Sequence, residues 1–346
     1  MKTRSRKPGL VACIILALIL GACGSPGVGG EGGNSNLPIS LRIMVGGLDK
    51  QIYLPNMLAQ RLGFFAQEGL DVTLIDEASG QSAEDEVMAS HVEAGSGSYN
   101  HTIELQASGK HMECVVQLID APGEAEVVST KAANTIRSVK DLVGKDLGVT
   151  ELGAGTQTLT ILLLHNAGIA ANQVDFVPVG AGDTFIAAMQ QGVIDAGMTT
   201  EPTISQLVSG GVGRVLVDLR TPATTQAALG GPYPFICVFM QNSYVNAHKA
   251  IVQRLVNAYV MTLKWIHTHT AQQITDMMPA DYYADGKAQY VQALQNQLQM
   301  YSPDGLMPAG GPQFVLQTEN ETNFAVKGQS IDLSATYTNE FVNNAP

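Results

Sequence analysis

Apolar runs of strand length alternate with longer amphipathic segments from residue 37 onward. Alternation of this kind predicts a mostly parallel sheet with helices on both faces. In such sheets ligands bind at the carboxyl ends of the strands, so the sequence predicts an α/β fold whose loops converge on a site. Strands are predicted over residues 40–45, 70–75, 114–119 and 126–130, and helices over 54–63, around 87–92 and from 100 to 108.

Residues 147–164 are the expected centre of that site. A short apolar strand leads into a glycine-bearing loop, and the loop opens a helix with Thr156 or Thr158 available as its cap. Unpaired backbone N–H groups and the positive end of the helix dipole attract an anion or another polar group to such a place. Most strand–glycine–helix turns bind nothing, so a binding role for this stretch requires evidence for similar loops elsewhere in the chain.

An internal repeat supplies that support. Residues 80–95 and 182–197 have the same length and similar ends, Val-Glu-Ala-Gly and Ile-Asp-Ala-Gly. A predicted strand precedes each copy, and a polar loop is predicted after each, over residues 96–100 and 198–202. The repeat predicts two similar α/β lobes that offer their loops to a shared cleft, with chance similarity of two such units as the alternative.

The N-terminal residues have the pattern of a lipoprotein leader. Four basic residues precede an apolar stretch over residues 10–20, which is too short to span a membrane. The sequence Leu20-Gly21-Ala22-Cys23 then matches the bacterial lipobox. We expect a signal peptide over 1–22, lipidation of Cys23 and a flexible tether over 23–36, which places the protein outside the cytoplasm on the bacterial membrane. An ordinary signal peptide with a coincidental cysteine is the alternative.

Charge and cysteine content narrow the function classes. The formal net charge is −12, and removal of the four basic leader residues leaves 15 basic against 31 acidic residues, a charge of −16. This balance argues against nucleic acid as a partner. Cys114 and Cys237 lie in apolar strand-like runs, where buried thiols are expected more than a disulfide. No run after the leader is long and apolar enough to cross a membrane.

Several motifs follow one another in a characteristic order, at residues 62–72, 139–149, 187–197, 201–202 and 233–235. In this ordered set, which with the lipobox spans residues 20 to about 270, the chain resembles the nitrate/sulfonate/taurine (NMT1/THI5-like) family of ABC-importer substrate-binding lipoproteins. Relatives in this family also bind thiamine-precursor pyrimidines. The resemblance implies a two-lobed, periplasmic-binding-protein-like fold of type II, with two crossovers and a ligand cleft that closes between the lobes.

The same resemblance divides the chain into lobes. Lobe 1 would comprise residues 37–125 and 226–346, and lobe 2 residues 126–225, with the return crossover over 219–234. Helices over 251–268 and 288–301 would pack on lobe 1. Trp265 lies among apolar residues at helical spacing in the first of these helices, which predicts a core position rather than a ligand contact.

Mapping the family's cleft loops onto this chain gives the candidate ligand-binding residues. Lys50 could offer a positive charge to an anionic group, and Tyr99 could stack on a planar ligand. Glu201 could accept a hydrogen bond from a ligand N–H or, alternatively, hold its own loop. The full set is Lys50, Gln51, Ser98, Tyr99, Asn100, His101, Gly155, Thr156, Gln157, Thr200 and Glu201.

An enzyme is the rival class, and the sequence offers little for it. There is no Gly-x-Ser-x-Gly elbow and no complete phosphate loop, and His267 and His269 are two residues apart on a predicted helix, a poor spacing for a metal pair. A surface adhesin or sensor is the third hypothesis. We therefore expect a monomeric solute-binding protein without catalytic residues, metal or cofactor, which delivers a small polar or anionic solute to an ABC permease. A thiamine-precursor-like pyrimidine or another small aromatic is the alternative ligand.

Overall fold

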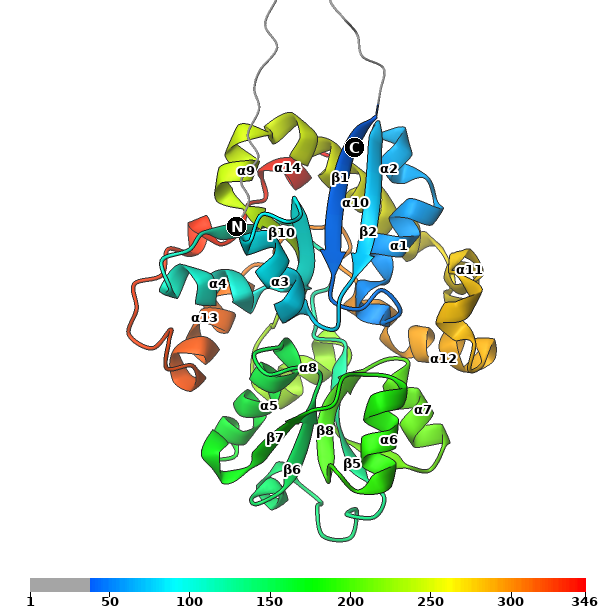
Figure 1. The fold of residues 1–346 in the computed structure, drawn as a ribbon, viewed down its shortest axis with the longest axis vertical. Coiled ribbons are helices and arrows are strands. Elements are labelled where there is room, and N and C mark those ends of the chain that lie inside the picture. Colours follow the sequence, from blue (N-terminus) through cyan, green and yellow to red (C-terminus); the bar gives the residue numbers. More distant parts are fainter. Residues whose placement is uncertain (1–37) are drawn as a thin grey trace, which may run out of the picture. The chain divides into compact units, whose positions relative to one another are not determined.

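Two five-stranded sheets organise residues 38–346, the part of the chain that the computed structural model describes (Figure 1). The predicted signal peptide, the lipidation site Cys23 and the tether lie outside the described residues. The strands are β1 (Ile39–Val45), β2 (Leu70–Asp76), β3 (Ala94–Ser98), β4 (Met112–Gln117), β5 (Glu124–Ser129), β6 (Asp146–Val149), β7 (Asp175–Pro178), β8 (Ala196–Thr200), β9 (Gly213–Leu219) and β10 (Ile236–Gln241).

The strand order shows two crossovers between the sheets. One sheet has the order β2-β1-β3-β10-β4 and belongs to lobe 1, and the other has the order β7-β6-β8-β5-β9 and belongs to lobe 2. β5 is antiparallel to β8 and β9, and β10 is antiparallel to β3 and β4. Each sheet therefore contains one antiparallel strand that arrives from the other lobe, which confirms the expected two-lobed α/β architecture.

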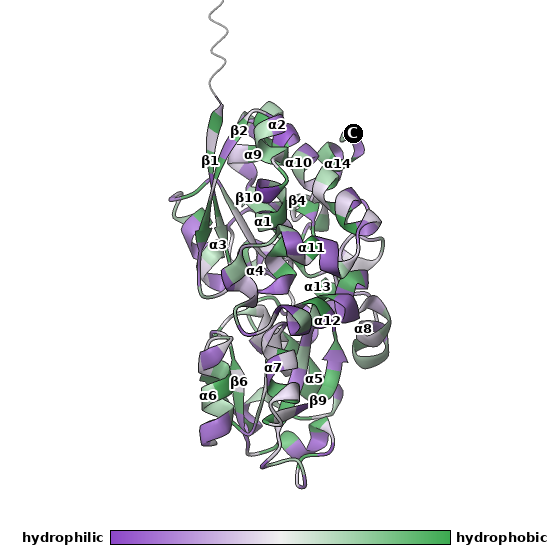
Figure 2. Ribbon diagram, turned by 90° about the vertical axis from the view of Figure 1, so that its right-hand side faces the viewer, coloured by the Kyte–Doolittle hydropathy of each residue, from purple (hydrophilic) through white to green (hydrophobic). Residues whose placement is uncertain are grey.

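Helices cover both sheets (Figure 1). Those of the C-terminal segment pack mainly on lobe 1, but the helices over residues 287–297 and 311–322 also contact helices of lobe 2. Figure 2 shows hydrophilic and hydrophobic stretches alternating along the outer helices, as expected for helices with one buried face. None of the helices among the described residues has the length and apolar character needed to cross a membrane. The α-helices are α1 (Leu54–Arg61), α2 (Phe64–Gln67), α3 (Gly80–Met88), α4 (Asn100–Ala107), α5 (Gly155–Asn166), α6 (Asp183–Gln191), α7 (Thr203–Ser209), α8 (Pro222–Leu229), α9 (Asn242–Ala247), α10 (Lys249–Thr268), α11 (Ala271–Met277), α12 (Lys287–Gln297), α13 (Gly311–Thr322) and α14 (Glu340–Asn343).

The internal repeat forms equivalent units in the two sheets. β2, α3 and β3 in lobe 1 correspond to β7, α6 and β8 in lobe 2. The prediction of loops over 96–100 and 198–202 is wrong for the first three residues of each stretch, because 96–98 and 198–200 belong to the central strands β3 and β8. Both strands are fully buried and close to their neighbours: a Cβ on Gly95 would lie 2.4 Å from the Phe239 ring. Small residues fit that space. Because most of them are not β-branched, the sequence did not indicate strands here.

The start of α5 also differs from the prediction. Ala154 is its N-cap residue and makes no side-chain cap, so neither Thr156 nor Thr158 caps the helix. The hydroxyl of Thr156 instead accepts a hydrogen bond from the backbone N–H of Thr150 at 3.0 Å. That bond holds the start of the loop after β6 against the first turn of α5. Without a side-chain cap, the first N–H groups of α5 remain available for other partners.

The core of lobe 1 contains the residues predicted to be buried there. Val256 and Leu263 of α10 are fully buried, while Trp265 packs at the edge of the core with its ring 3.7 Å from that of His269. Cys114 and Cys237 are buried free thiols on the neighbouring strands β4 and β10, as expected. The lobe 2 sheet begins at β5, two residues before the predicted boundary, and α8 packs on β9 and α5 of the same lobe.

Candidate functional site

A small cavity lies between the two lobes. It has about 20 Å³ of space for the centre of a water molecule, room for roughly one water, so a larger ligand requires the lobes to move apart. Residues of both lobes form its walls, which include hydroxyl-bearing side chains, glycines and aromatic side chains. The lining residues are Gly46, Lys50, Ile52, Tyr53, Ser79, Gly80, Ser98, Glu124, Thr150, Ala154, Gly155, Thr156, Thr200, Phe235 and Ile236.

Two helices, one from each lobe, begin at this cavity. α3 starts at Gly80 after the N-cap Ser79, whose hydroxyl accepts hydrogen bonds from the N–H groups of Gln81 and Ser82. α5 starts at Gly155 without a side-chain cap. The first N–H groups of a helix have no partner within the helix, so α5 offers donors to the space between the lobes. The N–H groups of Gln81 and Ser82 in α3 are already paired with Ser79, so α3 contributes mainly the positive potential of its N-terminus.

Among the described residues that line the cavity, Lys50 is the single basic one. Its side chain is buried, and its ammonium group donates to the carbonyl oxygens of Gly46 at 2.6 Å and Ala78 at 2.7 Å. Burial lowers the pKa of Lys50, and nearby carboxylates such as Glu124 act in the opposite direction. An ammonium group has three N–H donors, so these two carbonyls leave one for another acceptor.

Glu124 and Ser98 are polar groups of the wall that have no partner. Glu124 is 3 % exposed and begins β5, while Ser98 is 2 % exposed and ends β3. Neither the Oε2 atom of Glu124 nor the hydroxyl of Ser98 has a hydrogen-bond partner among the described residues. Burial raises the pKa of Glu124 well above its usual value, although Lys50 lowers it.

Five of the predicted ligand-binding residues line the cavity. Lys50 and Ser98 come from lobe 1, and the other three come from lobe 2. The hydroxyl of Thr200 donates to the carbonyl oxygen of Gly123 at 3.1 Å, so its role includes fixing the start of β5. The five are Lys50, Ser98, Gly155, Thr156 and Thr200.

The other predicted residues do not line this cavity, and their side chains have partners elsewhere. Gln51 donates from its amide to the carbonyl oxygen of Tyr290 at 3.0 Å and accepts from Gln297 at 2.7 Å. The hydroxyl of Tyr99 lies 2.6 Å from that of Thr336, inside lobe 1. These contacts are typical of structural residues.

Asn100, His101 and Gln157 are likewise directed away from the cavity. Asn100 donates to Glu104 at 3.1 Å, and Nδ1 of the fully buried His101 lies 3.1 Å from Glu84. Burial lowers the pKa of His101, but Glu84 and Glu104 together raise it above its usual value. Gln157 accepts from the backbone N–H of Gly153 at 2.7 Å, which orders the loop before α5.

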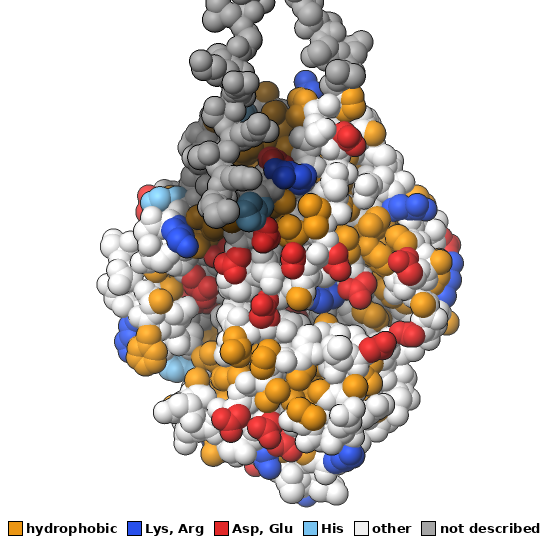
Figure 3. Space-filling model, viewed as in Figure 1, with side chains coloured by type: hydrophobic (Ala, Val, Ile, Leu, Met, Phe, Trp, Pro, Cys, Tyr) orange, Lys and Arg blue, Asp and Glu red, His pale blue; other side chains and the backbone are white. Residues whose placement is uncertain are grey.

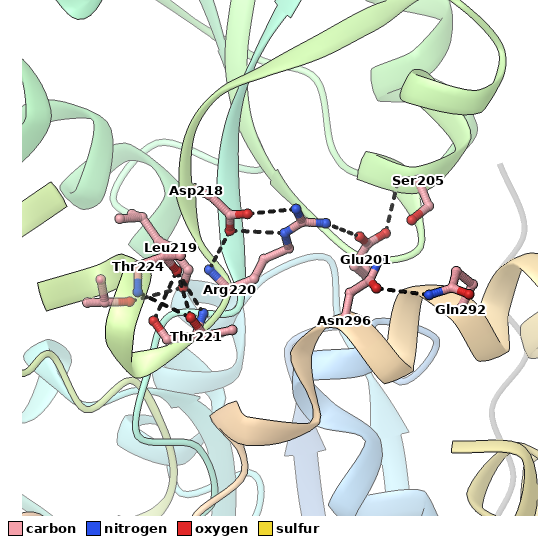
Figure 4. Close-up of polar contacts among 10 residues, drawn as sticks. Glu201, Ser205, Asp218, Leu219, Arg220, Thr221, Thr224, Gln292 and Asn296 are labelled. Carbon is pink, nitrogen blue, oxygen red and sulfur yellow. Dashed lines mark hydrogen bonds and ion pairs between the residues drawn. The ribbon is translucent and has the colours of Figure 1, made fainter. Parts of the chain in front are cut away.

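Glu201 is fully buried and pairs with Arg220 (Figure 4). One carboxylate oxygen accepts from the Arg220 guanidinium at 2.8 Å, and the other accepts from the backbone N–H of Ser205 at 2.9 Å. Arg220 also pairs with Asp218 at 2.7 Å. The structure therefore matches the alternative stated for Glu201, that it holds its own loop, and the carboxylate does not reach the cavity wall.

Sequence reasoning missed several residues of the cavity wall. Ser79 and Gly80 could have been found, since a small residue and a glycine that begins a helix follow β2 just as Ala154 and Gly155 follow β6. Glu124 also has a signal, because a carboxylate at the start of an apolar buried strand is unusual. No sequence signal identifies Tyr53 and Phe235, because they are aromatic residues whose orientation depends on packing between distant segments.

The fold and the cavity define the class of protein, a two-lobed periplasmic-binding-protein fold with a site between the lobes. The sequence model of the family described as NMT1/THI5 like matches residues 52–273. The chain belongs to the NMT1/THI5-like family.

Individual relatives agree with this assignment. A solved structure from Bordetella bronchiseptica RB50 is 32 % identical, covers 88 % of this chain and 96 % of its own, and superposes with a TM-score of 0.84. The alkanesulfonate-binding protein SsuA from Xanthomonas axonopodis pv. citri, bound to MOPS, is 17 % identical with a TM-score of 0.67, over 87 % of this chain and 99 % of its own.

A curated relative has an enzymatic name. The 4-amino-5-hydroxymethyl-2-methylpyrimidine phosphate synthase of Legionella pneumophila is 25 % identical over 164 residues, or 47 % of this chain. The match spans about half of that enzyme, 50 % of its length.

Proposed function

We propose that this protein is an extracytoplasmic solute-binding lipoprotein, anchored through Cys23, which captures a small polar solute between its lobes and delivers it to an ABC permease. The observation that carries the proposal is the meeting of two helix N-termini, from α3 and α5 in different lobes, at one cavity. A ligand held by both helices bridges the lobes and stabilises the closed form. The existence of a relative named as an alkanesulfonate-binding protein supports this class of function.

The ligand contacts follow from the cavity wall. Backbone N–H groups at the start of α5, the positive potential at the start of α3 and the ammonium group of Lys50 suit an oxygen-bearing or anionic group such as a sulfonate or nitrate. The hydroxyls of Ser98, Thr156 and Thr200 add polar contacts from both lobes. Because the closed cavity is small, we propose that the solute enters when the lobes separate and that the closed, liganded monomer docks on the permease.

A pyrimidine-like ligand is the second candidate, and a specific observation favours it. The side chains of Tyr53 and Phe235 line the cavity, and an aromatic wall suits a planar ring. The partial match to pyrimidine phosphate synthases points to the same chemistry. We propose binding rather than catalysis.

Thermal-shift screening with a library of small solutes tests the proposal, because a ligand that binds only the folded state raises the melting temperature. Calorimetry on each stabilising solute should give one site per chain, and mass spectrometry should recover the solute unchanged. An enzyme would convert it, and an adhesin would respond to no member of the library.

A variant locates the binding site. Lys50→Ala should weaken binding of the stabilising solute by about tenfold or more, because a charged donor is lost from the wall. Lys131→Ala is the matched control, since this exposed lysine also donates to a backbone carbonyl, that of Gln190, but lies outside the cavity. Equal affinity of both variants and the wild type would show that the solute binds elsewhere.

A further inference from the structure

A cluster of ionisable side chains in lobe 1 joins α3, α4 and α13 and lies outside the cavity. Nδ1 of His101 is 3.1 Å from Glu84 of α3 and 3.5 Å from Glu104 of α4. Asn323, directly after α13, donates from its amide to Glu104 at 3.0 Å and to Glu319 of α13 at 3.0 Å. We call these four ionisable residues, Glu84, His101, Glu104 and Glu319, the carboxyl cluster.

Burial distinguishes this cluster from the other acidic residues of the protein. Figure 3 shows acidic side chains gathered across the middle of one face, where water stabilises their charges. In the carboxyl cluster Glu84 is 5 % exposed, Glu319 is 1 % exposed and His101 is fully buried. A buried carboxylate needs a positive partner, or it takes up a proton. His101 supplies one positive charge at most, so the cluster must also hold a proton on a carboxyl group.

The pair Glu104 and Glu319 is where a proton is most needed. Both carboxyls accept from the same Asn323 amide, so two negative charges there would repel each other at short range. Oε1 of Glu319 has no hydrogen-bond partner in the part of the chain that the structure describes. Burial raises the pKa of Glu319 well above its usual value, and Glu104 raises it further. Glu319 is therefore protonated near neutral pH.

Other titratable groups face this pair or its neighbours. The phenol of Tyr233 approaches from the segment before β10, and burial together with Glu319 and Glu104 raises its pKa well above the usual value, so it stays neutral. Burial raises the pKa of Glu84 to about 7, although His101 lowers it. Asp85 and Lys110 act on Glu84 in opposite directions. None of these groups supplies Glu319 with a positive partner.

The helix that carries Glu319 connects the two lobes. α13 packs on α4 in lobe 1 and on α5 in lobe 2. On the α5 side, Nε2 of His165 lies 3.8 Å from Glu321. The start of α13 lies against the return crossover, where a Cβ on Gly231 would be 2.3 Å from the Phe314 ring. A change that loosens α13 from α4 therefore also weakens a contact between the lobes.

We propose that a proton held between Glu104 and Glu319 fixes α13 against α4, and that its loss to solvent at alkaline pH releases this helix and favours opening of the lobes. With the proton present, one carboxyl donates to the other. Without it, two carboxylates repel each other. The stabilising effect is complete at acidic pH and is lost as the pH rises through the raised pKa of the folded protein. This inference goes beyond the proposed function, because it concerns the protein without solute.

Hydrogen exchange of the full, ligand-free chain at about pH 6 and about pH 9 tests the inference. After correction for the chemical exchange rate, protection of α13 relative to that of α10, in the core of the same lobe, should fall by about tenfold or more at the higher pH. X-ray scattering should show a larger radius of gyration there. In Glu319→Gln, which cannot ionise, both quantities should be the same at the two pH values.

Glu104→Gln is a second variant, which removes the repelling partner and should at least halve the loss of protection. Glu321→Gln is the control, because it changes an exposed carboxyl of the same helix and should keep the wild-type pH dependence. If Glu321→Gln abolishes that dependence, the pair with His165 is responsible and the proposal is wrong.

Two further results would overturn the proposal. Equal losses of protection in Glu319→Gln and the wild type would show that the carboxyl cluster does not hold the helix. A constant radius of gyration, with loss of α13 protection at alkaline pH, would show that release of the helix does not open the lobes.

Discussion

Glu201 and Arg220 form an ion pair of 2.8 Å in which the carboxylate is completely buried and the guanidinium side chain is 16 % exposed (Figure 4). The pair links the end of β8 to the chain just after β9, within lobe 2. The backbone N–H of Gln51 also donates to the Glu201 carbonyl oxygen at 3.1 Å, so this residue connects the two lobes through its main chain as well. Glu201 therefore has a structural role: its side chain pairs within lobe 2, and its backbone contacts lobe 1.

A first prediction concerns the stability of this pair. Glu201→Gln should lower the free energy of unfolding by about 2–4 kcal/mol, because it leaves a partly buried guanidinium short of one partner. Urea denaturation measures the change. Glu340→Gln is the control: its pair with Lys249 is about half exposed on both sides and should change stability by less than about 1 kcal/mol. Equal effects of both variants would contradict the structural role of Glu201.

A second prediction concerns a side-chain contact between the lobes at the edge of the cavity. The carboxylate of Glu151, in lobe 2, accepts hydrogen bonds from the Ser82 hydroxyl at 2.8 Å and from the Ser79 hydroxyl, both in lobe 1. Glu151→Ala should shift the ligand-free protein toward the open form and speed solute release by about tenfold. X-ray scattering should detect a larger radius of gyration, and stopped-flow should give the release rate.

Asp175→Ala provides the comparison, because this exposed residue of lobe 2 lies on β7, outside the cavity. An unchanged radius and release rate in Glu151→Ala would mean that the serine–glutamate contact does not influence closure.

A third prediction uses the close approach of Gly155, in lobe 2, to Phe235, in lobe 1. A Cβ on Gly155 would lie 2.4 Å from the Phe235 ring, which is buried and has little freedom to rotate. Gly155→Ala should therefore cost about 1–3 kcal/mol in the closed form and weaken solute binding roughly tenfold or more by calorimetry. Thr158→Ala, in the same helix but outside the cavity, should bind as the wild type does. Wild-type affinity in Gly155→Ala would show that binding does not need this approach.

A fourth prediction concerns pH. Burial raises the pKa of Glu126 to about 8, while the Thr160 hydroxyl that donates to it lowers the pKa. The folded protein therefore keeps a proton that the unfolded chain has lost, and stability falls as the pH rises from about 5 to about 8. Glu126→Gln should raise the free energy of unfolding at pH 8 by about 1–3 kcal/mol and change it little at pH 5.

Urea denaturation at the two pH values provides the measurement for Glu126. Thr158→Ala serves as reference, because this substitution changes no titratable group and should leave the pH slope of stability unchanged. A slope in Glu126→Gln equal to that of the wild type would contradict the buried, protonated state of this carboxyl.

Part of the site could be predicted because local chemistry defines it. The loop before α5 is recognisable from its strand, glycines and helix, and Gly155 and Thr156 do line the cavity. Ser98 was found in the same way, from the repeat. The sequence could not show that the residues after Ser98 have a different role. Tyr99 and His101 come one and three residues after Ser98, but α4 begins there and their side chains are buried inside lobe 1.

The remaining residues depend on contacts between distant segments. Tyr99 finds its partner in Thr336, 237 residues further along the chain, and Gln51 finds Gln297 at a separation of 246. Such partners determine whether a polar side chain belongs to the framework or faces the ligand, and no local pattern encodes them. For the same reason the sequence could not distinguish Glu201, which pairs with Arg220, from Glu124, whose Oε2 atom has no hydrogen-bond partner in the part of the chain that the structure describes.

The sequence by itself determined the two-lobed α/β architecture, since the alternation of elements, the repeat and the ordered motifs are local signals of burial and chain direction. Only the tertiary structure decided which side chains reach the space between the lobes. That choice depends on the rotation of each helix and on the hydrogen-bond partners brought by the crossovers, and both arise when the two sheets pack together.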